Sequence, residues 1–286
     1  MQTPPVRRQN TVARAWVQTG IGLHSGRDVS VCLLPAAANA GRYFLRTDLP
    51  GAPVIPARVA AVSQTQLSTE LGAGEARVRT VEHLLAALVS HNIDNVCMEI
   101  DGPEVPLLDG SARGWCAAIA AAGRQAQPEA PAPAPLTLKN PIWLQDEHGG
   151  DAAIAAFPSP ATHLSYGIDF PTAAIGLQWG SWDPKSAEFT QAIAPARTFA
   201  LANQIESLRQ AGLIKGGSLE NALVCDENGW LNPPLRFANE PARHKLLDLV
   251  GDLSLLGVLP QVRVLAYKAS HRLHVRLARA LIEAQT

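Results

Sequence analysis

The sequence contains few cysteines, and none is spaced for metal binding or redox chemistry. Its four cysteines lie far apart, at positions 32, 97, 116 and 225, and no C-x-x-C pair occurs. Thiolate zinc clusters and thioredoxin-like sites both need closely spaced cysteine pairs. The sequence therefore excludes both kinds of site, and the scattered spacing predicts reduced thiols.

The sequence also lacks a strong charge of either sign and a long apolar run. Its 24 basic and 25 acidic residues leave a formal net charge of −1, too little positive charge to neutralise a nucleic-acid backbone. No segment approaches the roughly 18 apolar residues of a membrane span, and no apolar stretch follows the N-terminal arginines as it would in a signal peptide. We therefore expect a cytoplasmic protein without a transmembrane segment or a nucleic-acid partner.

What the sequence does contain is enough apolar material for two domains. Its 286 residues are about twice the usual domain size, and 47% of them are hydrophobic. A proline-rich segment, QPEAPAPAP at 127–135, divides the chain into nearly equal parts. Such a run favours extended polyproline geometry, so we expect a linker outside any sheet or helix between domains at 1–126 and 136–286.

Both parts of the chain combine strand and helix patterns. Short apolar or alternating runs predict four strands, at 29–34, 95–100, 152–156 and 164–170. Helical spacing of apolar residues predicts four helices, at 81–88, 201–211, 240–256 and 271–284, with Thr80 as the N-cap of the first. No short internal repeat is visible. Strands beside helices without strict β-α-β alternation predict an α+β fold.

The strongest chemical signal is a polar stripe on the helix expected at 240–256. His244, Asp248 and Asp252 follow one another at intervals of four, which places them on one helix face. The other faces are mostly apolar, so the helix should be buried and its polar groups need partners. A divalent metal is one such partner. An ordinary His–Asp hydrogen bond, with Asp252 in a capping or ion-pair role, is the other.

A metal site needs a third ligand, and the candidate is the dipeptide Glu82–His83. It falls in the first turn of the helix expected after Thr80. Catalytic zinc sites commonly use three His or carboxylate ligands plus water, with a neighbouring Glu as general base. His83 would complete the ligand count and Glu82 would be the base. Taken alone, however, the dipeptide favours the plainer interpretation of a helix-start acid beside an ordinary histidine.

Two further histidines, His271 and His274, lie three apart near the start of the last expected helix. A helix N-terminus disfavours an imidazolium, so a protonated acid at this place needs a nearby carboxylate, which Asp252 can supply. Without further context, a surface histidine pair is the favoured interpretation.

Glycine-rich segments at 20–26, 109–114 and 215–221 predict turns that need a positive φ or a backbone close to a ligand. Most such turns are structural. We interpret His24, in the first of them, as a turn residue.

Taken together, these segments resemble one family, the zinc-dependent UDP-3-O-acyl-N-acetylglucosamine deacetylases of lipid A biosynthesis. The most specific matching stretches are RTVEHLLAAL at 79–88 and RHKLLDLVGDL at 243–253. The others, which together span nearly the whole chain, are TGIGLHSG (19–26), QLSTEL (66–71), HNIDN (91–95), PEVPLLDGSA (103–112), ARTFAL (196–201), KGGSLENALV (215–224) and AYKASH (266–271).

The resemblance implies two similar two-layer α+β domains with the active site in the cleft between them. It implies one catalytic metal per chain, Zn²⁺ or, as an alternative in the cell, Fe²⁺. The implied ligands are His83, His244 and Asp248, which agrees with the count reached from helix spacing. Glu82 is implied to be the general base.

The remaining implied roles concern proton transfer and substrate contact. By resemblance, His271 is the second acid–base residue and Asp252 orients it. Thr198 is implied to stabilise the oxyanion, and Phe199 and Lys245 to contact the sugar nucleotide.

The implied reaction is hydrolysis of the N-acetyl group of UDP-3-O-acyl-N-acetylglucosamine to the free amine and acetate, the committed step of lipid A biosynthesis. The expected partner is thus an acylated UDP-amino sugar. Two alternatives stay open: a paralogous deacetylase of another acylated amino sugar, and a non-catalytic nucleotide-sugar binder. Two departures from the family pattern flank His271: Ser270 replaces a common glycine, and His274 stands where a polar amide is common.

Overall fold

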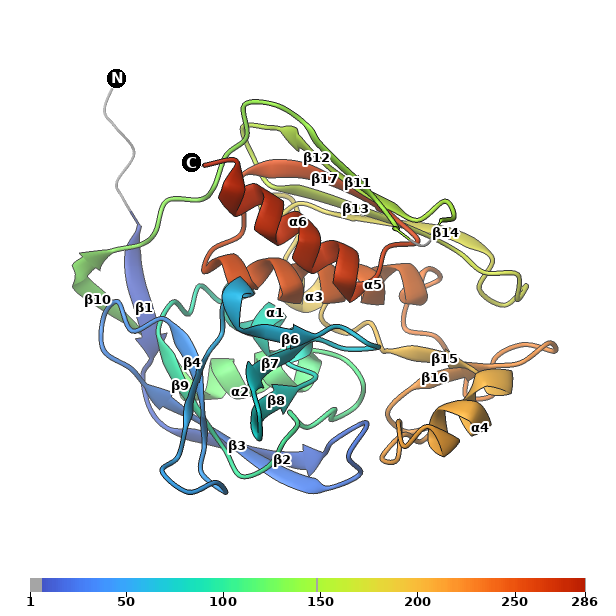
Figure 1. Cartoon of the computed structure of the whole chain (residues 1–286), viewed down its shortest axis with the longest axis horizontal. Coiled ribbons are helices and arrows are strands. Elements are labelled where there is room, and N and C mark those ends of the chain that lie inside the picture. Colours follow the sequence, from blue (N-terminus) through green and yellow to red (C-terminus); the bar gives the residue numbers. More distant parts are fainter. Residues whose placement is uncertain (1–6, 148, 286) are drawn as a thin grey trace.

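Two five-stranded sheets lie on either side of the central helices of this protein in the computed structural model, which describes residues 7–147 and 149–285 (Figure 1). The α+β class expected from the sequence is confirmed. None of the helices in the described part of the chain has the length and apolar character needed to cross a bilayer.

The N-terminal half is built on a sheet with strand order β2-β3-β9-β4-β5. Its strands are β2 (Trp16–Ile21), β3 (Asp28–Pro35), β4 (Arg42–Arg46), β5 (Val54–Pro56) and β9 (Val96–Ile100), and its helices are α1 (Glu82–Ser90) and α2 (Arg113–Ala122). β4 and β9 are parallel, and the other neighbours are antiparallel. Burial alternates along β3 and β4, as expected for a sheet with one face on the core.

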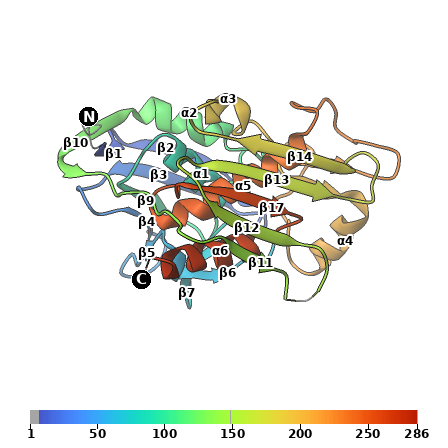
Figure 2. The same cartoon turned by 90° about the horizontal axis from the view of Figure 1, so that it is seen from above.

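The C-terminal half is built on a second sheet, with strand order β11-β12-β17-β13-β14. Its strands are β11 (Ile142–Gln145), β12 (Ala153–Pro158), β13 (His163–Asp169), β14 (Leu177–Trp182) and β17 (Val262–Tyr267), and its main helices are α5 (Glu240–Leu253) and α6 (His271–Glu283). Seen from above, this sheet lies over the helices (Figure 2).

The two halves share one topology. In each, the third strand in chain order is parallel to the fifth, which lies at the centre of the sheet, and all other neighbours are antiparallel. One helix precedes the central strand and another follows it, giving α1-β9-α2 and α5-β17-α6. The chain therefore contains a repeated unit far longer than the short repeats sought in the sequence. Helices α1 and α5 are equivalent in the two units.

These equivalent helices pack directly on each other at the centre of the molecule. The apolar residues of α1, including Leu84, Leu85 and Leu88, are fully buried. Gly251 of α5 lies against the backbone of Glu82, since a Cβ at this glycine would lie 2.8 Å from the Glu82 Cα atom. This contact brings the first turn of α1 onto the middle of α5, where the polar stripe lies.

Each half also carries an insertion outside its main sheet (Figure 1). In the N-terminal half it is a three-stranded sheet of β6 (Val62–Gln64), β7 (Glu70–Ala73) and β8 (Ala76–Arg79). In the C-terminal half it comprises β15 (Phe199–Leu201), α4 (Ala202–Gln210) and β16 (Leu223–Cys225). The remaining short helices are η1 (Val59–Ala61), α3 (Phe189–Ala192) and η2 (Ser254–Leu256).

The expectation that the proline-rich segment 127–135 lies outside any sheet is wrong for its first part. Residues up to Pro131 belong to β10 (Arg124–Pro131), which pairs with β1 (Arg8–Val12) in a two-stranded sheet. The register skips residues 128–130, so Pro128 lies in a bulge where no ladder hydrogen bond is needed. Proline is tolerated at such bulges and on edge strands, which a composition argument does not consider.

Thr80 is not the N-cap of α1, so that prediction is also wrong. The cap residue is Val81, and Thr80 has a positive φ of 58°. The Thr80 hydroxyl donates instead to Glu104 Oε1 at 2.8 Å, within the same half. The other expected strands and helices are present, with ends shifted by at most three residues.

Candidate active site

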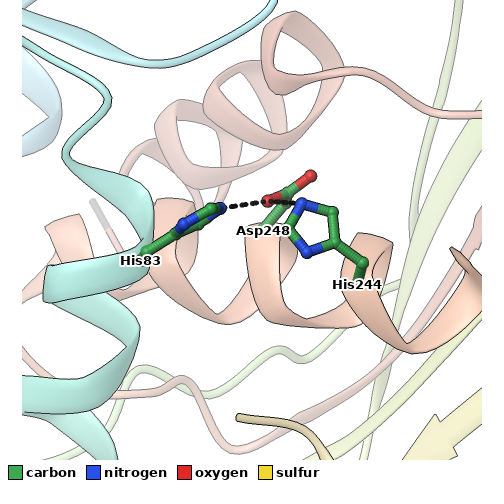
Figure 3. Close-up of side chains that lie close together, drawn as sticks. All are labelled: His83, His244 and Asp248. Carbon is green, nitrogen blue, oxygen red and sulfur yellow. Dashed lines mark ion pairs between the residues drawn. The ribbon is translucent and has the colours of Figure 1, made fainter. Parts of the chain in front are cut away.

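The three expected metal ligands converge from α1 and α5. His83 lies in the first turn of α1, and His244 and Asp248 lie one turn apart on α5 (Figure 3). The Nε2 atoms of His83 and His244 are 3.6 and 3.4 Å from Asp248 Oδ1. All three residues are buried, so their polar atoms need partners within the protein.

The spacing of these donor atoms fits a metal ion. Ligand atoms held 2.0–2.1 Å from one tetrahedral zinc ion lie about 3.4 Å from one another, close to the separations seen here. His244 Nδ1 donates to the Ala196 carbonyl at 3.1 Å, which leaves the Nε2 lone pair directed at the cluster. The described residues thus include a His/Asp group able to hold a metal.

The electrostatics of the group favour its ligating forms. Burial lowers the pKa of His244 to about 4, so its imidazole is neutral at pH 7. Burial opposes the charge on Asp248, but His244 and Lys245 outweigh it and hold the pKa of this carboxyl well below its usual value. Lys245 Nζ lies 2.6 Å from Asp248 Oδ2, which leaves Oδ1 to face the two imidazoles.

Glu82 lies beside this group and has the character of a base. Burial raises its pKa above the usual value for a glutamate. One carboxylate oxygen, Oε2, accepts a hydrogen bond of 3.1 Å from the Thr69 backbone N–H. One carboxylate oxygen of Glu82 lies within 4.8 Å of a carboxylate oxygen of Asp248 and of a ring nitrogen of His271. A raised pKa brings a carboxylate closer to the range in which it can both accept and release a proton.

His271 is held by Asp252 at the start of α6. Its Nδ1 atom donates to Asp252 Oδ2 at 2.8 Å, and its Nε2 atom lies 3.8 Å from Asp248 Oδ2. Burial disfavours the imidazolium, but the charge and hydrogen bond of Asp252 prevail and raise the pKa of His271 to about 9. Asp252 has its own pKa lowered to about 2, against the effect of burial, by His271 and His274. The arrangement gives a protonated imidazole next to the His83–His244–Asp248 group.

The residues expected to contact substrate line one cavity with this group. The cavity has a volume of about 290 Å³, and Thr198, Phe199 and Lys245 line it together with Glu82 and the three ligand candidates. The Thr198 N–H donates to the Gly110 carbonyl at 2.8 Å, which ties the 109–114 turn to the cavity wall. The structure thus brings all the expected site residues to one place.

A second, mostly apolar cavity of about 320 Å³ adjoins the first. Leu23, Leu67 and Phe199 line both cavities. Much of the rest of its wall comes from the C-terminal insertion, through Ile205 and Leu208 of α4. An apolar ligand could therefore extend from the polar site along this wall.

Comparison with known proteins decides the family. The family model for UDP-3-O-acyl N-acetylglycosamine deacetylase matches residues 9–283. The chain belongs to this family.

Its similarity to curated members extends over almost the full length of both chains. The UDP-3-O-acyl-N-acetylglucosamine deacetylase of Nostoc sp. is 58% identical over 278 residues, which cover 96% of this chain and 98% of that protein. The protein of the same name from Synechocystis sp. is 55% identical over 274 residues, with 96% and 98% coverage. The probable UDP-3-O-acyl-N-acetylglucosamine deacetylase 1, mitochondrial, of Arabidopsis thaliana is 43% identical over 298 residues, with 97% and 89% coverage.

In this family member, the glycine-rich turns serve backbone contacts between the two halves. Gly216 donates its N–H to the Leu23 carbonyl at 3.0 Å, and a Cβ at Gly216 would overlap the Gly22 carbonyl oxygen. The first and third turns therefore pack against each other. His24 is buried in the first turn and belongs to none of the metal-binding groups found among the described residues.

The interpretation of His271 and His274 as a surface pair is wrong, because both side chains are buried. Sequence reasoning also assigned no role to Thr69 or Tyr166. Thr69 lies in the matching stretch 66–71, so a signal for it existed, and its hydroxyl donates to Asp252 Oδ1 at 2.5 Å. Tyr166 lies on β13 outside every matching stretch, so only the fold reveals its contact with His274.

Proposed function

We propose that this protein hydrolyses the N-acetyl group of UDP-3-O-acyl-N-acetylglucosamine, releasing acetate and the free amine. The observation that carries the proposal is the convergence of Glu82, the His83–His244–Asp248 group and His271 around one cavity. Membership of the deacetylase family and the names of its relatives support the substrate. We further propose that the metal is Zn²⁺, with Fe²⁺ as an alternative in the cell, that the domains are 1–126 and 136–286, and that the protein works in the cytoplasm.

His83, His244 and Asp248 would hold the metal. A bound zinc ion supplies Lewis acidity, which lowers the pKa of a water molecule from 15.7 to about 7. Glu82 takes a proton from the attacking water as the water oxygen bonds to the acetyl carbon. Burial raises the pKa of Glu82, which makes its carboxylate a stronger base for this transfer.

Collapse of the tetrahedral intermediate breaks the carbon–nitrogen bond of the amide. His271, which carries a proton at pH 7 because of Asp252, has its Nε2 atom 3.8 Å from Asp248 Oδ2 and delivers that proton to the departing amine. The Thr198 hydroxyl lines the cavity and donates to the oxygen that becomes negative during attack. The amine leaves with the proton from His271, and acetic acid gives up its remaining proton to leave as acetate. The enzyme is restored when Glu82 releases its proton to solvent and His271 takes one up.

The two cavities suit the two ends of the proposed substrate. Lys245 supplies positive charge and Phe199 an aromatic face at the polar cavity, where we place the sugar nucleotide. The adjoining apolar cavity along α4 would take the acyl chain.

The test is acetate release from UDP-3-O-acyl-N-acetylglucosamine by zinc-loaded protein. Glu82→Ala and His271→Ala should each lower kcat by about 10²–10⁴-fold while keeping the metal. His83→Ala should lose the roughly one equivalent of metal that elemental analysis finds in the wild type. Wild-type turnover by both acid–base variants would overturn the mechanism.

The alternatives give different results in the same assay. A paralogous enzyme would turn over another acylated amino sugar faster than this substrate, which a panel of head groups and acyl chains would reveal. A nucleotide-sugar binder would retain the substrate in equilibrium dialysis without releasing acetate.

A further inference from the structure

Asp252 binds two imidazoles, although the proposed mechanism uses only one of them. His274, one turn after His271 on α6, places Nδ1 2.8 Å from Asp252 Oδ2, the same oxygen that His271 Nδ1 contacts at 2.8 Å. The two rings are 5.7 Å apart. His274 and Asp252 are both fully buried, so neither exchanges this contact for water.

The far side of His274 is anchored to the loop that precedes His271. Its Nε2 atom lies 3.1 Å from the Tyr166 hydroxyl, and the rings of these two residues meet edge to face at 5.6 Å. The Tyr166 hydroxyl donates to the Ala269 carbonyl, two residues before His271. Tyr166 is itself fully buried on β13. His274 therefore connects Asp252 to the backbone segment that positions His271.

The hydrogen bonds to Asp252 also require that Nδ1 of each ring carries a proton. An ionised carboxylate only accepts hydrogen bonds, so both imidazoles donate through Nδ1. The other oxygen, Oδ1, accepts from the Thr69 hydroxyl. The three donors fix the orientation of the Asp252 carboxylate. The Nε2 atom of His271 is left facing the His83–His244–Asp248 group.

His274 does not line either of the two cavities of the site. Any effect of His274 on the reaction must therefore pass through Asp252 or the 269–271 segment. Outer partners of this kind commonly change activity by about 10–100-fold when they are removed.

We propose that His274 is a positioning residue that, together with Tyr166, holds Asp252 and thereby orients His271 toward the reacting amide. The kinetic tests of this proposal rest on the proposed deacetylase function, whereas the NMR test does not.

Two amide variants separate the two contacts of His274. His274→Asn keeps an N–H near the position of Nδ1 and can still donate to Asp252. His274→Gln places its amide near the position of Nε2, so it reaches Tyr166 but not Asp252. We expect His274→Asn to stay close to wild-type activity and His274→Gln to lose about 10–100-fold in kcat with KM unchanged. Equal kcat values for the two variants would overturn the proposal.

A double-mutant cycle tests whether His274 acts through His271. In the His271→Ala background, adding His274→Gln should cause no further loss, because the residue to be oriented is absent. An equal loss in both backgrounds would overturn the proposal. Elemental analysis should find the same metal content in His274→Asn and wild type. A missing equivalent would make His274 a metal ligand instead and would also overturn it.

NMR gives a readout without catalysis. The Nδ1 proton of His271, bonded to a carboxylate, should give a low-field resonance that is assigned by its loss in His271→Gln. It should persist in His274→Asn and shift or broaden in His274→Gln. An unchanged resonance in His274→Gln would overturn the proposal.

If the wild type releases no acetate, the proposed function fails while this NMR measurement still decides the role of His274. Should the amide variants not fold, Tyr166→Phe replaces them: the resonance should shift, and an unchanged resonance would again overturn the proposal.

Discussion

At the scale of single residues, three buried carboxylates within one site have different acid strengths. Burial raises the pKa of Glu82 by more than the nearby imidazoles of His271 and His83 lower it. The same burial acts on Asp248 and Asp252, but the charges of neighbouring groups hold their pKa values below the usual range. Environments that separate pKa values in this way commonly separate roles, which here would be the proposed proton acceptor, the proposed metal ligand and the proposed orienting anion.

The first prediction concerns pH. The pKa of His271 is raised to about 9, so its acid form is present at neutral pH and is lost as the pH rises through about 9. We expect kcat for acetate release to fall with a midpoint near that pH. The residual activity of His271→Gln should lack this basic limb. A limb at the same pH in His271→Gln would assign the ionisation to another group.

At the scale of secondary-structure elements, the site depends on the close contact of α1 and α5. Gly251 permits this contact, because any side chain there would meet the backbone of Glu82. Glycine lowers intrinsic helix stability by about 1 kcal/mol relative to alanine. A glycine in the middle of α5 is thus explained by packing rather than by helix propensity.

We predict that Gly251→Ala destabilises the protein by about 1–3 kcal/mol despite the better helix propensity of alanine, because the overlap is with backbone atoms. It should also weaken metal binding, since α1 carries His83. Urea unfolding and chelator competition measure the two effects. The matched control is Gly180→Ala, whose Cβ would come closest to the tip of the Leu246 side chain, at 3.0 Å, and would lie in ordinary contact, at 3.5 Å, with the Ala242 backbone. Equal effects of the two substitutions would contradict this explanation.

A second prediction at this scale concerns α4, which forms a wall of the apolar cavity. Leu208 lines the cavity, whereas Ser207 next to it is exposed. Leu208→Trp should raise KM for a substrate with a long acyl chain and leave a short-chain analogue nearly unaffected, because only the long chain reaches the added ring. Ser207→Trp is the control and should behave as wild type. A uniform change of KM for both substrates would place the acyl chain elsewhere.

At the scale of the whole molecule, the site exists only where the two repeated units meet. Arg42 of β4 crosses this boundary: its guanidinium donates to the carbonyls of Ser254 and Gly257 at 3.0 and 2.9 Å, and to Ile93 at 2.8 Å. The side chain is buried, and burial lowers its pKa to about 10, which still leaves it charged at pH 7. One residue of the first unit thus holds the end of the helical segment that carries two ligand candidates.

We predict that Arg42→Met destabilises the protein by about 2–4 kcal/mol, because it leaves buried carbonyl groups without a donor. It should also lower metal affinity by loosening the contact between the units. Arg46→Met is the control, since Arg46 is also buried but its hydrogen bonds to Asp48, Glu75 and Arg77 stay within the first unit. The control should lose stability while keeping metal affinity, as measured by chelator competition. A parallel loss of affinity in both variants would show a general effect of unfolding.

The sequence by itself determined what depends on local geometry. Helical spacing put His244, Asp248 and Asp252 on one face of a buried helix, because residues four apart in an α-helix always lie one above the other. Motifs along the chain indicated the family, which the comparisons show. Local patterns also located most of the strands and helices, although they misplaced the cap of α1.

Only the tertiary structure decided which distant residues meet. Thr69 and Asp252 lie 183 positions apart and share a hydrogen bond because α1 and α5 pack at Gly251. The burial of His274 and its contact with Tyr166 depend on a strand and a helix packing together, for which the sequence carries no periodic signal. The length and composition indicated two parts, but the shared topology made them equivalent units. Packing between those units, rather than any local pattern, assembles the site.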